Sequence, residues 1–285
     1  DPWNRQDPFR HGAPHRTFLR EEEEEEGREV KAGEKAAERK EEESSIKSVI
    51  VPGEVVRIKD LTLKTPDNSR VLIENLNIEV QKGQHLLIVG NSGAGKSSLL
   101  RAIAGLWTAG KGEITRPPPG ETFFLPQRPY CTLGSLREQL LYPQRPGSAD
   151  KKLPSDDELL QILQKVKLQD LAPRLSAQDG GNGLDSVRDW SSMLSLGEQQ
   201  RLAFGRLLAN SPRVAILDEA SSALDLMSEK SMYELLENLP HLTYISVGHR
   251  PSLLHYHDMK LKLKGDKFEI EKIADTSEKQ QIVAL

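Results

Sequence analysis

The run GNSGAGKS, at residues 90–97, constrains this chain more than any other feature of its sequence. It fits the pattern G-x-x-x-x-G-K-[ST], in which glycines let successive backbone N–H groups turn inward around a phosphate. The apolar run LLIV precedes it and the helix-favouring residues 98–104 follow it, which is the strand–loop–helix context of a phosphate-binding loop. We therefore predict that this loop binds a nucleoside triphosphate.

Each part of the loop has an expected contact. Lys96 can reach the β- and γ-phosphates, and the Ser97 hydroxyl can ligate Mg²⁺. A Gly-rich turn without a ligand is the alternative, which the flanking strand and helix patterns disfavour. The residues expected to surround the nucleotide here are Gly90, Asn91, Ser92, Gly93, Ala94, Gly95, Lys96, Ser97 and Ser98.

Charge is unevenly distributed along the 285 residues. Residues 21–43 carry twelve Glu against five Lys or Arg, whereas the chain from residue 44 onward is close to neutral. Such a block buries too little apolar surface to offset its ordering entropy, so we expect residues 1–45 to be a disordered acidic lead or linker. A charged helix or coiled coil is the alternative, but Val30 and the nearby alanines make no heptad seam.

Composition also limits the class of protein. The nearly neutral folded part offers no basic surface for nucleic acid. Cys131 is the only cysteine, so no internal disulfide can form and a reducing compartment is expected. No apolar run approaches the ~18–20 residues that cross a bilayer. The chain begins at Asp1 without a signal-peptide pattern, so we expect a fragment or a processed product.

Alternating strand and helix patterns predict an α/β fold with a parallel core. The runs LLIV and VAIL are continuously apolar, as expected of strands buried on both faces of a sheet. The earliest strands are expected to form a small antiparallel sheet, and a hairpin around Gly265–Asp266 is expected near the end. The predicted strands are Val55–Ile58, Leu61–Lys64, Val71–Val80, His85–Val89, Thr122–Leu125, Val214–Leu217 and Leu242–Val247.

The domain boundaries follow from these patterns. We predict one folded domain at residues 46–273 and a polar tail at residues 274–285. A mostly helical insertion at residues 128–194 lies within a helical subdomain of about residues 128–205. Inside it, Ser155 and Glu158 match a capping box that begins a helix.

The run RVAILDEA, at residues 213–220, supplies the acids that a phosphate-binding loop needs. Asp218 emerges at the end of a predicted buried strand, where a magnesium-linked carboxylate is expected. Glu219 comes next and can accept a proton from an attacking water. A strand that simply ends in solvated acids is the alternative, which the upstream phosphate loop makes the weaker interpretation.

The run LSLGEQQR, at residues 194–201, predicts a second phosphate site. Ser195 and Glu198 match a capping box at the start of a helix over residues 196–209. A serine hydroxyl, the Gly197 backbone and the positive end of the helix dipole meet there. We do not expect one chain to place this site on the ligand of its own phosphate loop. An ordinary capped helix is the alternative.

The order of the motifs resembles a known family. After the phosphate loop come FLPQRPY with Gln127, LSLGEQQR, VAILDE, SALD at residues 222–225, and SVGHR with His249. This series resembles the ATP-binding domain of an ABC transporter over about residues 54–265. The resemblance implies a P-loop NTPase (RecA-like) fold with a parallel-sheet core, a small antiparallel β subdomain and a helical signature subdomain. It implies ATP and Mg²⁺ as cofactors and a second such domain as partner.

The resemblance also implies roles for the matching residues. Glu219 is the implied catalytic base, and His249 and Lys96 are implied to contact the γ-phosphate. Gln127 is the implied sensor of a membrane domain and contacts the nucleotide. The implied Mg²⁺ ligands are Ser97, Gln127 and Asp218.

The signature departs from the family's usual L-S-G-G-Q. Leu196 and Glu198 stand at its third and fifth positions, while Ser195 and Gly197 keep the residues that contact a partner's γ-phosphate. We expect all four positions to line the partner's ATP, and Asp225 to be the D-loop residue. The family's adenine-stacking aromatic normally lies near Thr65, but residues 61–80 contain no aromatic side chain, so we expect adenine stacking to be absent or supplied from elsewhere.

The runs GLWTAGKGEITRPPP and FFLPQRPYCTLGSLREQLLYP resemble subfamily D half-transporters, the peroxisomal fatty-acyl carriers and their lysosomal, plastid and bacterial relatives. This resemblance implies a membrane half upstream of residue 1, a homo- or heterodimer, and a fatty acid or acyl-CoA cargo, with cobalamin or peptides as alternatives. The ATP-binding domain would face the cytosol or a stroma-like compartment. A soluble ABC-type ATPase and a nucleotide-binding module without turnover are the alternatives, disfavoured respectively by the single phosphate loop and by Glu219 with His249.

Overall fold

The computed structural model describes residues 27–40, 45–53, 56–91, 93, 95–144 and 152–273. The chain divides into two units, residues 1–45 and residues 46–285. In the first unit, residues 27–40 form a helix whose residues are all exposed, which corrects the expectation of disorder for this stretch. Its Ala, Glu, Lys and Arg residues have high helix propensity, which explains a helix without a packed face. The rest of the expected lead before residue 45, and the tail at residues 274–285, lie outside the described residues.

The larger sheet of the second unit has six strands in the order β12-β11-β4-β10-β9-β6. Its neighbours pair in parallel, except for the antiparallel pair β11 and β12, which is the predicted hairpin. The parallel core is therefore confirmed. The strands are β4 (His85–Gly90), β6 (Thr122–Leu125), β9 (Val214–Asp218), β10 (Thr243–Val247), β11 (Met259–Lys264) and β12 (Lys267–Lys272).

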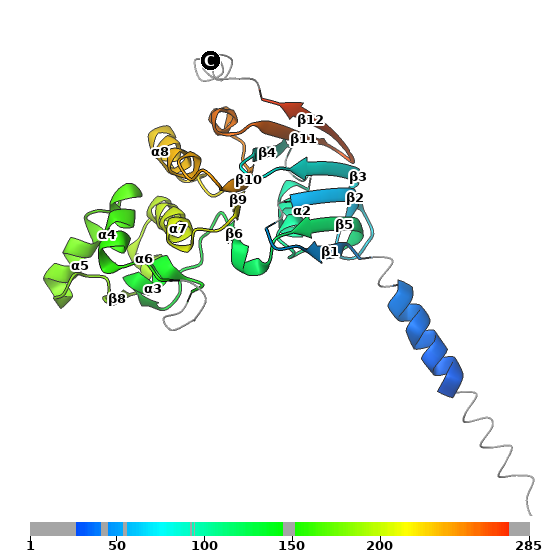
Figure 1. The fold of residues 1–285 in the computed structure, drawn as a ribbon, viewed down its shortest axis with the longest axis horizontal. Helices are drawn as coiled ribbons and strands as arrows, with labels where there is room; N and C mark the ends of the chain where they lie inside the picture. Colours follow the sequence, from blue (N-terminus) through cyan, green and yellow to red (C-terminus); the bar gives the residue numbers. More distant parts are fainter. Residues whose placement is uncertain are drawn as a thin grey trace, which may run out of the picture. The chain divides into compact units, whose positions relative to one another are not determined.

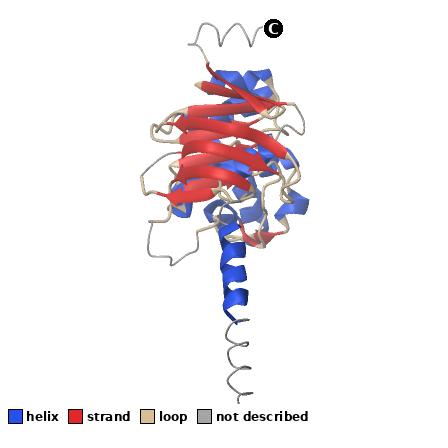
Figure 2. Cartoon of the chain, turned by 90° about the vertical axis from the view of Figure 1, so that its right-hand side faces the viewer, coloured by secondary structure: helices blue, strands red, loops and turns tan. Residues whose placement is uncertain are grey.

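A smaller sheet has the order β1-β5-β2-β3 and faces the viewer in Figure 2. It is antiparallel except where β1 pairs in parallel with β5. Two predicted strands form one strand, β2, with a register irregularity between Ile58 and Leu61. Gly110 opens β5 with a φ of +139°, and a Cβ there would lie 2.0 Å from the Thr62 carbonyl oxygen, so only glycine fits. The strands are β1 (Lys47–Ile50), β2 (Val56–Lys64), β3 (Val71–Val80) and β5 (Gly110–Arg116).

The interior strands of the larger sheet are buried on both faces. Leu86 and Ile88 of β4 belong to a hydrophobic cluster shared with the smaller sheet and α2. Leu87, between them, belongs to a second cluster shared with α7 and α8. Figure 1 shows α2 on one side of β4, β10 and β9, and α7 and α8 on the other. Two covered faces explain why the LLIV run has no polar alternation.

The helical part lies at the side of the larger sheet that carries α7 (Figure 1). Both hydrogen bonds of the predicted capping box at Ser155 and Glu158 are present, and the buried Trp190 donates its indole N–H to the Gly134 carbonyl at 2.9 Å. Among the described residues, none of the helices has the length and apolar character that a membrane span requires. The helices and remaining strands are α2 (Lys96–Ile103), η1 (Pro119–Glu121), β7 (Gly134–Ser135), α3 (Leu136–Leu141), α4 (Asp156–Lys165), α5 (Leu171–Asp179), β8 (Val187–Arg188), α6 (Trp190–Met193), α7 (Leu196–Asn210), α8 (Leu226–Glu237) and η2 (Pro251–Tyr256).

Candidate nucleotide site

The parallel pairing of β4, β10, β9 and β6 places their carboxyl ends at one edge of the sheet. Gly90 ends β4, Asp218 ends β9, and Gln127 and His249 each stand two residues beyond the ends of β6 and β10. Ligands of open α/β sheets bind beyond this edge. The topology therefore gathers residues that are far apart in the sequence.

The phosphate loop joins β4 to α2. Gly95 caps α2 in the left-handed conformation, with a φ of +87° that favours glycine. Lys96 is buried and its Nζ donates to the Gly90 carbonyl oxygen at 2.6 Å, which closes the loop on its own lysine. Ser98 lies in the first turn of α2 and Asn91 follows β4. Ser92 and Ala94, both expected to contact the nucleotide, lie outside the described residues.

Ser97 and Asp218 meet across the site. The Ser97 hydroxyl donates to Asp218 Oδ1 at 3.1 Å. Burial raises the pKa of Asp218, although the hydrogen bond from Ser97 opposes the rise. Burial likewise lowers the pKa of Lys96, against the attraction of Glu219 and Asp218. A hydroxyl and a carboxylate oxygen are ligands that Mg²⁺ accepts beside phosphate oxygens and water, so this pair fits the predicted metal.

Lys96, His249 and Glu219 form a contiguous group. His249 Nε2 lies 2.7 Å from Glu219 Oε1, and Lys96 Nζ lies 3.3 Å from His249 Nδ1. The same Lys96 Nζ lies 3.5 Å from His249 Nε2, so the lysine faces both ring nitrogens, whose donor and acceptor roles follow the tautomer. Glu219 has a left-handed φ of +51° and donates its backbone N–H to the Val247 carbonyl at 3.0 Å. Strain of this kind is often found at functional sites.

Gln127 does not join the predicted metal ligands in this structure. Its side-chain amide donates to the Ser222 hydroxyl at 3.3 Å, and its backbone carbonyl accepts from the Gln200 side-chain amide at 2.8 Å. Ser97 and Asp218 contact each other without it. Gln127 is therefore tied to the segment after β9.

The predicted capping box at the start of α7 is confirmed. The Ser195 hydroxyl accepts from the Glu198 backbone N–H at 3.2 Å, and a Glu198 oxygen accepts from the Ser195 N–H at 3.0 Å. Leu196 begins the helix. Among the described residues, the side-chain hydrogen bonds of Ser195 stay within this turn. Asp225 caps α8 by accepting from the Ser228 N–H at 2.7 Å.

Three residues beside the site escaped the sequence analysis. Arg250 follows His249 directly, and its guanidinium donates to the Ser222 carbonyl at 2.9 Å. The buried Glu229 of α8 pairs with it at 3.3 Å. Gln200 accepts from the Ala223 N–H at 2.9 Å. The neighbourhood of His249 could have singled out Arg250, but nothing in the sequence marks Glu229 as buried.

The turn between β2 and β3 carries Thr65. Its hydroxyl donates to Asp67 Oδ1 at 2.6 Å, and hydrogen bonds led by that one lower the pKa of Asp67 to about 2. The indole of Trp107 donates to the Lys64 carbonyl at 2.9 Å. An aromatic side chain thus lies beside the end of β2 although residues 61–80 contain none, because Trp107 arrives from beyond α2.

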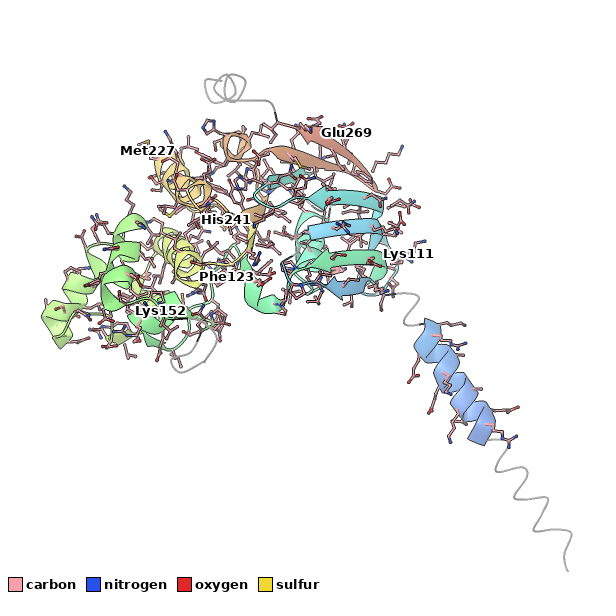
Figure 3. The ribbon with its side chains drawn as sticks, in the orientation of Figure 1. Lys111, Phe123, Lys152, Met227, His241 and Glu269 are labelled. Carbon is pink, nitrogen blue, oxygen red and sulfur yellow. The ribbon has the colours of Figure 1, made fainter. Side chains whose placement is uncertain are left out.

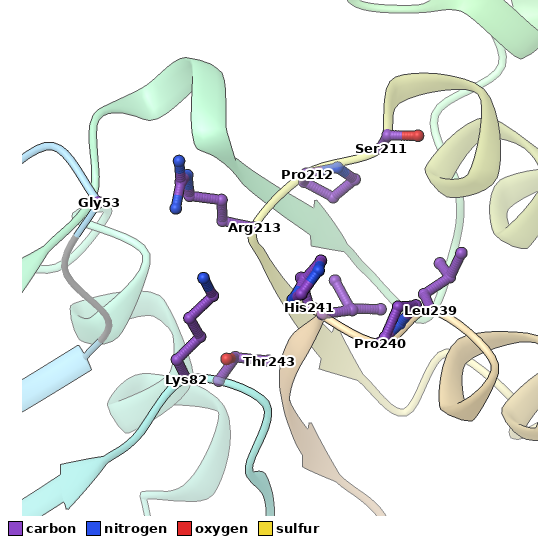
Figure 4. A pocket seen from close by; sticks show the side chains of 10 residues that line it. Gly53, Lys82, Ser211, Pro212, Arg213, Leu239, Pro240, His241 and Thr243 are labelled. Carbon is purple, nitrogen blue, oxygen red and sulfur yellow. The ribbon is translucent and has the colours of Figure 1, made fainter.

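Two cavities lie at opposite ends of the larger sheet. One of about 210 Å³ is lined by Glu219, His249 and Arg250 among others, at the carboxyl ends of β9 and β10. The other, of about 370 Å³, lies where these strands begin, and Lys82 and Arg213 point toward it in Figure 4. Only the first lies at the edge where α/β sheets bind ligands.

Comparisons with known proteins identify the family. A family model described as ABC transporter matches residues 73–222. An uncharacterized ABC transporter ATP-binding protein of Synechocystis is 52% identical over 214 residues, which cover 75% of this chain and 31% of that protein. The chloroplastic ABC transporter D family member 2 of Arabidopsis thaliana is 42% identical over 248 residues, covering 73% of this chain and 34% of that protein.

A solved structure shares the fold. A bacterial Atm1-family ABC exporter with ATP bound aligns with a TM-score of 0.67 at 24% identity, over 84% of this chain and 43% of that one. The chain thus spans about a third of the length of the curated relatives it matches.

Proposed function

The chain belongs to the ABC transporter family, in which this domain binds and hydrolyses ATP, and we propose that it powers a larger half-transporter through ATP-driven pairing of two such domains. One observation carries the proposal. Lys96, Glu219 and His249 meet at one edge of the sheet, whereas Ser195 uses its hydroxyl to cap its own helix. One chain thus offers a phosphate loop with Glu219 and His249 and, apart from it, a signature turn at Ser195. A second copy would bring its signature turn to the phosphate loop of the first.

The side chains at the site suit hydrolysis of the γ-phosphate. Lys96 and His249 can stabilise charge that develops on the transferred group, while Glu219 orients and polarises the attacking water. Ser97 and Asp218 would hold Mg²⁺, which neutralises phosphate charge when it is bound. Because Gln127 contacts Ser222, it would reach the metal only after leaving that contact.

Apolar exposure beside Asp225 supports a partner domain. Leu226 and Met227, in the first turn of α8, are 62% and 77% exposed, and Figure 3 shows Met227 at the outer side of that helix. Exposed apolar residues next to a predicted interface residue are typical of contact surfaces. A second copy of this domain would cover them.

A membrane partner is supported by the surface that follows Gln127. Leu133 is 91% exposed and Tyr130 is also exposed, in the stretch between β6 and α3. A transmembrane half carried on the same full-length protein would cover this surface. From the likeness to subfamily D we propose a fatty acid or acyl-CoA as cargo.

Distance measurement between two copies of the full-length protein tests the pairing. Met227→Cys carries a spin label in a full-length protein that has Glu219→Gln and every native cysteine, Cys131 included, replaced by Ser. ATP is then bound without turnover. We expect the interspin distance to shorten with Mg·ATP relative to Mg·ADP. An unchanged distance at saturating Mg·ATP would contradict the proposal.

The cargo needs a separate test. In liposomes, ATP hydrolysis by the full-length protein should rise with long-chain acyl-CoA and stay at its basal rate with cobalamin. If only cobalamin stimulates hydrolysis, the proposal of a lipid cargo is wrong, whereas the proposed pairing of two ATP-binding domains is unaffected.

A further inference from the structure

Arg250 connects two loops that belong to different strands. It follows His249 in the loop after β10, and its guanidinium donates to the Leu224 carbonyl at 2.5 Å and the Ser222 carbonyl at 2.9 Å. Those carbonyls lie in the loop after β9, in the segment Ser222–Asp225. Two carbonyls that would otherwise need water are thus satisfied by one planar cation.

The Arg250 guanidinium is held in turn by the buried carboxylate of Glu229. Its side chain is 1% exposed, and its Oε2 lies 3.3 Å from the Arg250 guanidinium. The Ser221 hydroxyl donates to it at 2.7 Å and the Ser252 hydroxyl at 2.9 Å. A buried carboxylate is tolerated only when it is paired and hydrogen-bonded, so Glu229 holds Arg250 in one orientation.

The segment held by Arg250 lies against the first turn of α7. A Cβ on Gly197 would lie 3.2 Å from the Ala223 carbonyl oxygen. Gln200, one turn further along, accepts from the Ala223 N–H at 2.9 Å and donates to the Ser222 hydroxyl at 3.1 Å. Arg250 on one side and Gln200 on the other therefore clamp residues 222–224.

We propose that Arg250 is a positioning residue that sets the first turn of α7 from the loop of His249, and so links the two ATP sites of a dimer. The proposal rests on the proposed pairing of domains, in which His249 belongs to one composite site and Ser195 to the other. Within one chain the link runs from the His249 loop through Arg250 to residues 222–224, and from there to Gly197 and Gln200. Hydrolysis at one site then depends on Arg250 of the copy that supplies the signature.

A mixed dimer of the full-length protein, with two differently tagged copies, tests this. Lys96→Ala in copy one leaves hydrolysis to the phosphate loop of copy two, which uses the signature of copy one. Arg250→Met is then placed either in copy one or in copy two. When Arg250→Met is in copy one, it affects the signature that serves the active site. The His249 loop of that active site belongs to copy two and stays unchanged.

We expect Arg250→Met in copy one to lower kcat by up to about a hundredfold, as a displacement of about 1 Å can, with the KM for ATP little changed. The loss should exceed that from the same change in copy two. An equal or smaller loss in copy one overturns the proposal, because Arg250 would then matter no more in the copy that supplies the signature than in the copy that supplies His249.

A double variant separates positioning from folding. Arg250→Met alone leaves Glu229 buried without its cation, so the melting temperature should fall. Adding Glu229→Gln removes that charge and should restore the melting temperature while kcat stays low. Recovery of kcat together with the melting temperature overturns the proposal.

Two controls keep the tests distinct. Arg213→Met in copy one removes a half-exposed arginine paired with Glu121, where β9 begins, and should leave kcat unchanged. Ser195→Arg in copy one should abolish hydrolysis. Continued hydrolysis with that variant refutes the pairing of domains itself, whatever the result at Arg250.

Discussion

His249 Nε2 lies 2.7 Å from Glu219 Oε1, so that one side-chain contact joins the loops after β10 and β9. Both residues follow strands that pair in register, Val247 with Asp218. The contact places an acceptor for a proton and a donor to phosphate side by side. Changing either residue should therefore affect chemistry more than binding.

For Glu219→Gln, we expect ATP affinity to persist and turnover to fall by about 10²–10⁴-fold, the usual contribution of a general base. The amide keeps the size and a hydrogen bond to His249 but cannot take a proton. Phosphate release and calorimetry measure the two effects. Glu121→Gln is the matched control, because Glu121 lies in η1 and pairs with Arg213 where β9 begins, away from the nucleotide site. Normal steady-state hydrolysis by the Glu219 variant would remove this residue from its proposed role.

Lys96→Ala should weaken ATP binding. A hydrogen bond to a charged group contributes roughly 1.5–3 kcal/mol, so the dissociation constant should rise by about tenfold to a hundredfold. Calorimetry on the full-length protein measures it. Lys82→Ala, an exposed lysine beside the cavity where the strands begin, serves as the control. Equal affinities for the parent and the Lys96 variant would argue against the phosphate loop.

Two serines with the same local geometry separate capping from function. Ser155 and Ser195 each accept a 3.2 Å hydrogen bond from the third residue of the helix they begin. Replacing either by Ala should destabilise the fold by about 0.5–2 kcal/mol, the usual cost of a lost cap. Only Ser195→Ala should also slow hydrolysis. If both variants hydrolyse ATP like the parent, Ser195 is only a cap.

Asp218→Asn should stabilise the fold at neutral pH in the absence of nucleotide. Burial raises the folded-state pKa of Asp218 above its unfolded value, so the ionised form costs stability above both values. The cost disappears as pH falls through the folded pKa toward the unfolded value, where both states bind the proton. Urea unfolding should show that Asp218→Asn has a higher free energy of unfolding than the parent at pH 7, and that this difference is smaller near pH 4. A gain of the same size at both pH values would contradict this.

Local sequence patterns correctly predicted the buried strands of the larger sheet and the starts of two helices. The apolar runs of β4 and β9 marked buried strands, and the S-x-x-E spacing marked the starts of α4 and α7. These features depend on neighbours a few residues away. They are therefore readable in one sequence.

Contacts between distant segments were not readable outside the motifs of the nucleotide site. The strand β1 exists because it pairs with β5, more than sixty residues along the chain, and its own residues carry no strong pattern. Gln127 meets Ser222 and Arg250 meets Glu229 only after the loops are in place. The helix at residues 27–40 was only the alternative interpretation, because this stretch has few apolar residues and no heptad seam. The helix propensity of its Ala, Glu and Lys residues is enough without either.

The two-sided burial of β4 has a consequence for how this protein can change. Deleting one residue between Leu86 and Val89 would turn every following side chain of the strand to the opposite face. Both hydrophobic clusters would then lose packing contacts. Lys96 would also be displaced by about 3.3 Å along the strand. The composition of this stretch can drift among aliphatic residues, but its length cannot. The fixed length of β4 therefore sets where the phosphate loop begins.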